Sequence, residues 1–300
     1  MPVEPLGAGT AMLPPGTFAE DVVAITGGGT GLGRAMAVEF ARLGAAVAVL
    51  SRSVEHLEQG AAAIRAAGGR AIVAPVDVRD PDAVEAALDS IEDQAGRPVS
   101  VLVNNAAGNF ASPAEDLSAR AWRAVTQIVL DGTFLMSSSL ARRCQRHGEG
   151  AAILNVGASY GWTGGPGAAH SAAAKAGVMN LVQTLAVEWA PLDIRVNGIV
   201  PGPFPHGDFP EALHRQFDAG LGSRRVPLGR VGALHEIGWA ATYLCSRYAA
   251  FVTGHNFVID GGSWLRRGLA LPEFVPIRDQ LGHQVPAVEI AAPGTEPVSG

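Results

Sequence analysis

The stretch DVVAITGGGTGLGRAMAVEFARLGAAVAVLSR, residues 21–52, predicts how this chain folds. Residues 21–26 form a short run rich in β-branched side chains, which is typical of a strand buried in a parallel sheet. The glycine-rich turn 27–33 follows, and then the amphipathic segment 34–44, which ends at a glycine as helices commonly do. Residues 45–52 read as a second buried strand. A strand, a glycine turn, a helix and a second strand together predict a dinucleotide-binding unit.

The glycine turn is the first candidate binding site. Glycine lets backbone N–H groups come close to a pyrophosphate, and the N-terminus of the following helix adds its positive dipole end. We therefore expect cofactor contacts from six residues of the turn: Gly27, Gly28, Gly29, Thr30, Gly31 and Leu32. The alternative interpretation is a tight turn that binds no ligand.

The residue that ends the second strand of such a unit separates NAD from NADP. An acid there accepts a hydrogen bond from the ribose 2′-OH, whereas an arginine pairs with a 2′-phosphate. This chain has Arg52 there, with no acid nearby before Glu55, and Arg34 could add a second positive charge. NADP(H) is therefore the predicted cofactor. The alternative is that both arginines are solvated surface residues.

Strands and helices alternate along the rest of the chain. The pattern predicts helix 54–67, strand 70–76, helix Pro81–Ala95, strand 99–103, helix 117–146, strand 151–156, a helix ending near 189, strand 194–200, helix 234–248 and strand 256–260. This alternation indicates an α/β fold with a single doubly wound, Rossmann-type parallel sheet and helices on both faces.

The same pattern divides the chain into three parts. Residues 1–18 are rich in proline and glycine and are expected to form an N-terminal arm. Residues 19–263 form the Rossmann-type domain, in which the Pro/Gly-containing excursion at about 203–226 is the expected substrate lid. Residues 264–300 form a C-terminal extension, whose first part is expected to pack on the body or on a neighbouring subunit.

Composition narrows the possible functions. With 48% hydrophobic and 17% charged residues, the chain can bury a large core and is not a disordered protein. A formal net charge of −6 argues against nucleic acid as a partner. Two distant cysteines and scattered histidines indicate neither a disulfide framework nor a metal site. Without a signal-like N-terminus or an apolar run of about 20 residues, we expect a soluble, cytoplasmic protein.

The candidate catalytic stretch is NVGASYGWTGGPGAAHSAAAKAG, residues 155–177. It contains Lys175, the single lysine in a sequence whose other basic residues are arginines, which suggests a role that arginine cannot fill. Ser171 shares a helix face with Lys175, and Tyr160 precedes that helix on a loop at a strand end. The alternative is a solvated lysine beside a half-buried tyrosine.

Polar residues also follow two other strands. The carboxylate of Asp77 could accept from an adenine amino group, or it could cap the helix that follows. In NNAAGNF, residues 104–110, small side chains such as Ala106 let a cofactor lie against the strand end. The asparagines, Asn105 among them, can tie neighbouring strands together.

Several of these motifs, in order, resemble the short-chain dehydrogenase/reductase family: TGGGTGLG, NNAAG, the lysine helix, PGP and the terminal VIDGG. The resemblance covers residues 21–263. It implies a seven-stranded sheet, hydride transfer with a nicotinamide, and dimers or tetramers. It also implies cofactor contacts from Asn105, Ala106, Lys175 and from four residues in the DVRD and PGPF phrases: Val78, Pro201, Gly202 and Phe204.

The chain departs from the usual members of that family at the catalytic positions. Those members carry tyrosine four residues before the lysine, serine seventeen before it, and an asparagine in the preceding long helix. Here these positions are Ser171, Ala158 and Val129.

These departures coincide with the 2,4-dienoyl-CoA reductase branch of mitochondrial type. That branch has its tyrosine fifteen residues before the lysine, at Tyr160, and a serine at Ser171; phrases such as GGGTGLG, DVRDP and NNAAGNF also match it. The resemblance implies NADPH-dependent reduction of a dienoyl-CoA thioester in fatty acid β-oxidation, with Tyr160 as a donor to the thioester oxygen. It also implies a CoA contact at Arg79.

The second donor in that branch is an asparagine, which corresponds to Asp131 here. An ionised aspartate accepts hydrogen bonds but does not donate them, so Asp131 must be protonated, turned away or compensated if the same reaction is to run. It could also be a plain helix residue. Two other functions remain open: a carbonyl reductase or alcohol dehydrogenase that uses Tyr160, and an NADP-binding protein without catalysis.

Overall fold

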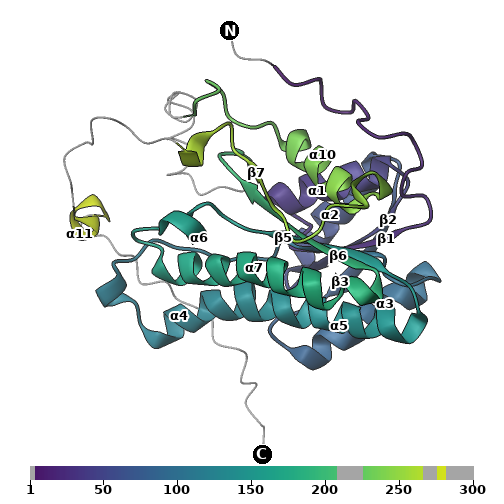
Figure 1. The fold of residues 1–300 in the computed structure, drawn as a ribbon, viewed down its shortest axis with the longest axis horizontal. Coiled ribbons are helices and arrows are strands. Elements are labelled where there is room, and N and C mark those ends of the chain that lie inside the picture. Colours follow the sequence, from purple (N-terminus) through teal and green to yellow (C-terminus); the bar gives the residue numbers. More distant parts are fainter. Residues whose placement is uncertain (1–3, 208–225, 266–275, 282–300) are drawn as a thin grey trace, which may run out of the picture.

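The structure is a computed structural model of the 300-residue chain, and it describes residues 4–207, 226–265 and 276–281. A single seven-stranded sheet runs through it in the order β3-β2-β1-β4-β5-β6-β7 (Figure 1). Every neighbouring pair is parallel. The strands are β1 Val22–Thr26, β2 Ala46–Ser51, β3 Arg70–Pro75, β4 Val101–Asn104, β5 Ala151–Val156, β6 Ile194–Pro201 and β7 Asn256–Ile259. The predicted fold class is confirmed.

Helices cover both faces of the sheet (Figure 1). The helices that the structure describes are α1 Gly31–Arg42, α2 Val54–Ala66, α3 Pro81–Ala95, α4 Ala119–Thr126, α5 Gly132–His147, α6 Tyr160–Thr163, α7 Ala169–Glu188, α10 Leu234–Cys245 and α11 Ile277–Leu281. Several begin or end with the expected signals. Asp80 caps the N-terminus of α3 by accepting from two backbone N–H groups, and Gly96 ends that helix in the left-handed region.

Strand β1 shows why the sheet needs a helical layer on each side. All five of its residues are buried, and successive side chains point to opposite faces. Val23 and Ile25 belong to the core that α1, α2 and α10 share. Val22 and Ala24 belong to the core formed with α3 and α5. Its apolar character on both faces therefore places β1 at the centre of the domain.

The strand order creates a crevice at the carboxyl ends of the two central strands, β1 and β4. The chain moves outward from β1 to β3 and then returns to the other side of β1 with β4. The loops that follow β1 and β4 thus leave the sheet in opposite directions. Ligands of open α/β sheets bind at such a switch point, outside the carboxyl ends of the strands.

The segment predicted as one helix, 117–146, is a continuous helical stretch in the structure, residues 119–147, with a π turn inside it. Helix α4 ends at Thr126, a π-helical turn occupies Gln127–Asp131, and α5 begins at Gly132. At Gly132 the helix passes so close to the loop after β3 that an added Cβ would lie 2.6 Å from Val78 Cγ2. A π turn holds an extra residue and rotates the side chains around it, and apolar periodicity does not reveal it.

The described part of the N-terminal arm is attached to the domain. Leu13 and Phe18 belong to the same core as α1 and α10, and the ring of Phe18 meets Phe40 edge-on at 5.0 Å. Trp239 Nε1 of α10 donates to the Thr10 carbonyl at 3.1 Å. The core thus begins before residue 19, where the domain was expected to start.

The two segments near the carboxyl end are also held by side chains. Trp264 packs against Trp162 with ring centroids 5.3 Å apart. Arg278 Nη2 lies 2.9 Å from both Glu115 Oε1 and Asp116 Oδ1. Most of the predicted lid, 208–225, lies outside the described residues. Within the described ranges, no helix is long and apolar enough to cross a membrane.

Candidate active site

A cleft of about 580 Å³ opens at the carboxyl ends of the strands, where the strand order reverses. This size is typical of a cofactor or substrate site. It brings together segments from the whole chain, namely the glycine turn, the ends of β2 to β6 and the start of α6. Its lining includes these predicted residues: Gly27, Thr30, Gly31, Leu32, Arg52, Asp77, Val78, Asn105, Ala106, Tyr160, Lys175 and Pro201.

The glycine turn divides into residues that face the cleft and residues that face the protein. Gly27 and Gly31 line the cleft with φ angles of 63° and 48°, which only glycine adopts readily. Gly28 and Gly29 do not line it. An added Cβ would lie 3.0 Å from the Ile25 carbonyl oxygen at Gly28, and 2.0 Å from that of His56 at Gly29. These two glycines let the turn pack tightly on β1 and α2.

Gly33→Ala is expected to lower the free energy of unfolding by more than about 2 kcal/mol, although alanine favours helices. Its Cβ would lie 2.2 Å from the Gly27 carbonyl oxygen and 2.5 Å from Asn105 Nδ2, two groups fixed by other contacts. Urea unfolding measures this loss. The matched control is Gly7→Ala, because nothing lies within 4 Å of a Cβ there. Equal stability of the two variants would contradict the described packing of the turn.

Asparagines at the end of β4 join the strand ends beneath the cleft, as the sequence predicts. Asn105 Nδ2 donates to the carbonyls of Thr26 at 3.0 Å and Gly27 at 3.1 Å. In return, Thr26 Oγ1 accepts from the backbone of Asn105 and Ala106. On the other side, Asn104 Nδ2 donates to Asn155 Oδ1 of β5 at 2.9 Å. The crevice between β1 and β4 is therefore held at a fixed width.

At the end of the cleft formed by β2 and β3, one carboxylate stands between two arginines. Arg79 binds Asp77 in a fork, with Nε 2.9 Å from Oδ1 and Nη2 2.5 Å from Oδ2. Arg52 Nη1 lies 3.8 Å from the same Oδ2. The hydrogen bond from Arg79 holds the pKa of Asp77 below its usual value. Asp77 does not cap α3, since Asp80 does.

Arg79 was expected to contact the substrate. In the structure it does not line the cleft, and its guanidinium is engaged by Asp77. Arg34 also lies outside the cleft lining, with Nη1 3.4 Å from the Gly29 carbonyl.

The candidate catalytic residues meet at the opposite side of the cleft, where α6 and α7 approach each other. The Tyr160 hydroxyl lies 3.1 Å from Ser171 Oγ, and either can donate. Ser171 is 2% exposed and stands one helical turn before Lys175 on α7. Lys175 Nζ donates to the carbonyl of Val156, at the end of β5. Tyr160 thus reaches the lysine helix from outside it.

Burial changes the acidity of Lys175. Its side chain is enclosed by the protein, and burial alone lowers its pKa to about 8. No carboxylate in the described part of the chain forms an ion pair with it. The site therefore holds a buried positive charge one helical turn after Ser171, whose Oγ contacts the Tyr160 hydroxyl.

Asp131, predicted as a catalytic residue, lies outside the cleft. It is the last residue of the π turn, is exposed, and does not line the cleft. Ile128, from the same turn, lines the cleft instead. The physical reason is the wide turn itself, which directs Ile128 inward and leaves Asp131 facing solvent.

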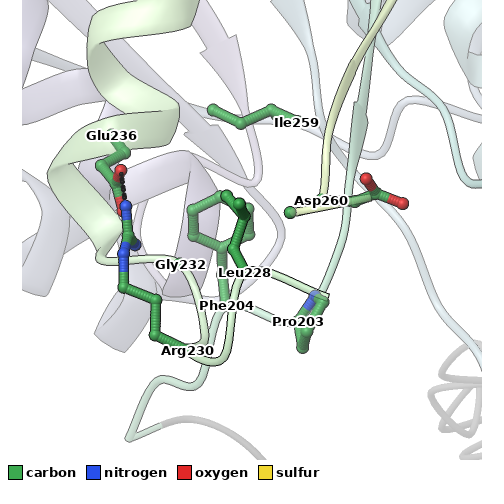
Figure 2. Close-up of a pocket in the computed structure, with 9 residues that line it drawn as sticks. Pro203, Phe204, Leu228, Arg230, Gly232, Glu236, Ile259 and Asp260 are labelled. Atoms are coloured by element: carbon green, nitrogen blue, oxygen red, sulfur yellow. Dashed lines mark hydrogen bonds and ion pairs between the residues drawn. The ribbon is translucent and has the colours of Figure 1, made fainter. Parts of the chain in front are cut away.

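Gly202 and Phe204, both predicted to bind the cofactor, also lie outside this cleft lining. Gly202 packs on Asp260, where an added Cβ would be 2.5 Å from Asp260 Cβ. Phe204 is 3% exposed and lines a separate pocket of about 90 Å³. Figure 2 shows it beside the Arg230–Glu236 ion pair and across from Asp260. Gly202 and Phe204 therefore pack the loop after β6 on the side that does not line the cleft.

Among the cleft residues that were not predicted from the sequence are His56, Ile128 and His206. The ring of His206 lies over Gly31, where an added Cβ would be 2.9 Å from its Cε1. His206 belongs to the PGPFPHG phrase that follows β6, so the motif located its segment but not its side chain. No sequence signal separates His56 and Ile128 from ordinary helix residues.

Comparison with known proteins identifies the family. Residues 27–263 match the family model described as enoyl-(acyl carrier protein) reductase. The chain belongs to the short-chain dehydrogenase/reductase family. This family consists of oxidoreductases, and its fold is the one described above.

Among its relatives is a Bacillus subtilis protein named "probable 2,4-dienoyl-CoA reductase [(2E)-enoyl-CoA-producing]". It is 42% identical over 245 residues, which cover 81% of this chain and 96% of that one. A Caenorhabditis elegans relative named "probable 2,4-dienoyl-CoA reductase decr-1.2 [(3E)-enoyl-CoA-producing]" is 37% identical, covering 82% and 81%. A solved short-chain dehydrogenase from Bacillus anthracis is 41% identical with a TM-score of 0.76, covering 83% and 99%.

Proposed function

We propose that this short-chain dehydrogenase/reductase is an NADPH-dependent reductase of 2,4-dienoyl-CoA thioesters. The observation that carries the proposal is the contact between the Tyr160 hydroxyl and Ser171, one turn from Lys175. A phenol is thereby supplied to the lysine helix from α6, while the helix position that carries tyrosine in ordinary family members holds a serine. The relatives named 2,4-dienoyl-CoA reductase support the same assignment.

The cleft fits a nicotinamide dinucleotide. Gly27 and Gly31, without side chains, leave room for a pyrophosphate at the N-terminus of α1. Asp77 and Arg52 stand at the adenosine end, and Lys175 stands at the far end, where it would hold the nicotinamide ribose. The cofactor supplies a hydride when it is bound. Arg52 favours NADPH, because a guanidinium there pairs with a 2′-phosphate.

The residues near Tyr160 suit the charge that a dienoyl thioester develops. Hydride addition at the far end of the conjugated system moves negative charge onto the thioester oxygen. Tyr160 would donate its O–H to that oxygen, and Ser171 would orient the phenol. The buried ammonium of Lys175 would favour the same charge through its field. Asp131 takes no part, because it faces solvent.

The proton that completes the reaction would come from water in the cleft. Val129 occupies the position of the asparagine that usual members use in a proton relay. It is buried in an apolar cluster with Val125, Ala174 and Val178. No polar side chain of that cluster can pass a proton toward Lys175. Protonation at the α carbon then gives a 3-enoyl thioester.

The substrate proposal is tested by following NADPH oxidation with three thioesters: 2,4-hexadienoyl-CoA, acetoacetyl-CoA and a simple 2-enoyl-CoA. We expect turnover with the dienoyl thioester and little with the other two. Turnover of acetoacetyl-CoA instead would contradict the proposal and indicate a carbonyl reductase in which Tyr160 donates a proton. No turnover of any thioester by a chain that binds NADPH would also contradict it, and would favour a binding protein without catalysis.

Arg52→Ala is expected to weaken NADPH binding by about 10- to 100-fold, in line with the loss of one charge-assisted phosphate contact. NADH lacks the 2′-phosphate, so its affinity should stay close to that of the unaltered protein. Fluorescence titration gives both dissociation constants. Arg97→Ala is the matched control, because it removes the same charge at the opposite end of the sheet, where Arg97 pairs with Glu20. Equal losses for both coenzymes in Arg52→Ala would refute the 2′-phosphate role.

A further inference from the structure

At the adenosine end of the cleft, Asp77 is bound more closely by Arg79 than by Arg52. Asp77 receives both arms of the fork from Arg79, at 2.9 Å and 2.5 Å, as well as the Arg79 backbone N–H at 3.1 Å. Arg52 reaches the same carboxylate at 3.8 Å, and its side chain is 57% exposed. Asp77 is thus bound to Arg79, while the guanidinium of Arg52 remains accessible from the cleft.

We propose that Arg79 determines coenzyme specificity by holding Asp77, so that Arg52 can bind the 2′-phosphate of NADPH. The inference rests on the proposed NADPH dependence of this chain. Arg79 is a positioning residue in this scheme, because it acts through Asp77 and has no contact of its own with the coenzyme.

The charge balance explains why such a residue is needed. Asp77 and Arg52 alone would form a neutral pair, and the carboxylate would repel a phosphate placed beside it. With Arg79 bound to Asp77, the three groups carry a net charge of +1, so that one unit of positive charge remains for a phosphate beside Arg52. At about 4 Å near a protein surface, one such charge changes affinity by about tenfold or more.

The local chain geometry holds the Asp77 carboxylate on Arg79. Arg79 follows Asp77 by two residues in the turn between β3 and α3, and backbone and side-chain bonds from Arg79 fix the carboxylate together. Asp80, the residue after Arg79, caps α3 by accepting from the backbone N–H groups of Asp82 and Ala83. Among the described contacts, the Arg79 guanidinium bonds to Asp77 and not to Asp80.

The test uses two ligands that differ only in the phosphate of interest, adenosine 2′,5′-bisphosphate and adenosine 5′-monophosphate. Calorimetric titration of the full chain gives the ratio of their affinities. Any change in the adenine contact affects both ligands and cancels in the ratio. We expect the unaltered protein to prefer the bisphosphate. Arg79→Ala should lower this preference by about tenfold, because Asp77 then draws Arg52 to itself.

A double variant separates an effect through Asp77 from a direct phosphate contact. In Asp77→Asn/Arg79→Ala, the Asp77 carboxylate no longer competes for Arg52. The preference for the bisphosphate should then return to within about threefold of its original value. Such a recovery would show that positions 77 and 79 are strongly coupled. Arg79→Lys should keep part of the preference, since lysine pairs with a carboxylate without the fork. Arg97→Ala, with the same charge change at the other end of the sheet, should keep all of it.

Each contrary result overturns a different part of the scheme. An unchanged ratio in Arg79→Ala, or an equal loss of both ligands, would mean that Arg79 has only a structural role. A loss that persists in the double variant would mean that Arg79 itself contacts the phosphate. If the unaltered protein shows no preference for the bisphosphate, the proposed NADPH dependence fails, and this inference fails with it.

Discussion

Tyr160→Phe is expected to lower kcat with 2,4-hexadienoyl-CoA by about 10²- to 10³-fold, the usual cost of removing one donor to a developing oxyanion. The substitution removes a single oxygen and keeps the ring that Gly165 packs against. It also breaks the 3.1 Å contact with Ser171 and leaves Lys175 on its Val156 carbonyl. NADPH should therefore bind as before, and steady-state kinetics together with a binding titration separate the two effects.

The control for this substitution is Tyr248→Phe, which removes the same atom from a tyrosine that is 61% exposed and outside the cleft lining. It should leave both turnover and binding unchanged. A Tyr160→Phe variant that keeps full turnover would remove Tyr160 from the mechanism. A variant that loses NADPH binding in proportion to turnover would show instead that the phenol helps to build the coenzyme site.

Lys175→Met is expected to abolish most activity and at the same time to stabilise the fold. Activity falls because the variant loses both the contact to the nicotinamide ribose and the positive field near the thioester oxygen, a loss of about 10²-fold or more. Stability rises because the wild-type chain buries an ammonium whose described hydrogen-bond partner is a backbone carbonyl. Methionine has a similar shape and no charge to desolvate.

The stability gain should depend on pH in a defined direction. Burial lowers the pKa of Lys175 from 10.5 to about 8 in the folded chain. Between these values the unfolded chain binds more protons than the folded one, so the wild-type free energy of unfolding rises with pH. The advantage of Lys175→Met is therefore largest below pH 8, on the order of 3 kcal/mol, and fades as the pH approaches 10.5.

Chemical denaturation of both chains at several pH values measures this difference. Lys175→Arg is the matched control, because its guanidinium stays charged throughout this pH range. Its free energy of unfolding should therefore not approach that of Lys175→Met as the pH rises. A difference between Lys175→Met and wild type that does not change with pH would contradict a lowered pKa for Lys175.

The fold was predictable because its signals are local and repeated. Buried runs such as Ala151–Val156, separated by helices with caps and glycine ends, predict a parallel sheet strand by strand. The roles of Asn104 and Asn105 in joining strand ends also followed from their place at the end of the fourth strand, and the structure confirms that they do so.

The site was less predictable, because side-chain direction depends on tertiary packing. The π turn directs Asp131 to solvent and Ile128 to the cleft, and no pattern of residues announces it. Gly28 and Gly29 share a motif with Gly27, yet contacts with β1 and α2 decide which of them face a ligand. Arg79 looked available to a substrate, because the sequence does not show that its fork meets Asp77.

In the proposed reaction, hydride enters at the far end of a conjugated thioester while negative charge develops on the oxygen beside Tyr160. The measurement is nuclear magnetic resonance of the product formed in ordinary water from 2,4-hexadienoyl-CoA and NADPH that carries deuterium at both hydrogen positions of the nicotinamide C4. We predict one deuterium at C5, a solvent proton at C2 and a double bond between C3 and C4. Deuterium at C5 with a double bond between C2 and C3 would contradict protonation at the α carbon. Deuterium at C3, or none in the product, would contradict hydride transfer to the far end of the thioester.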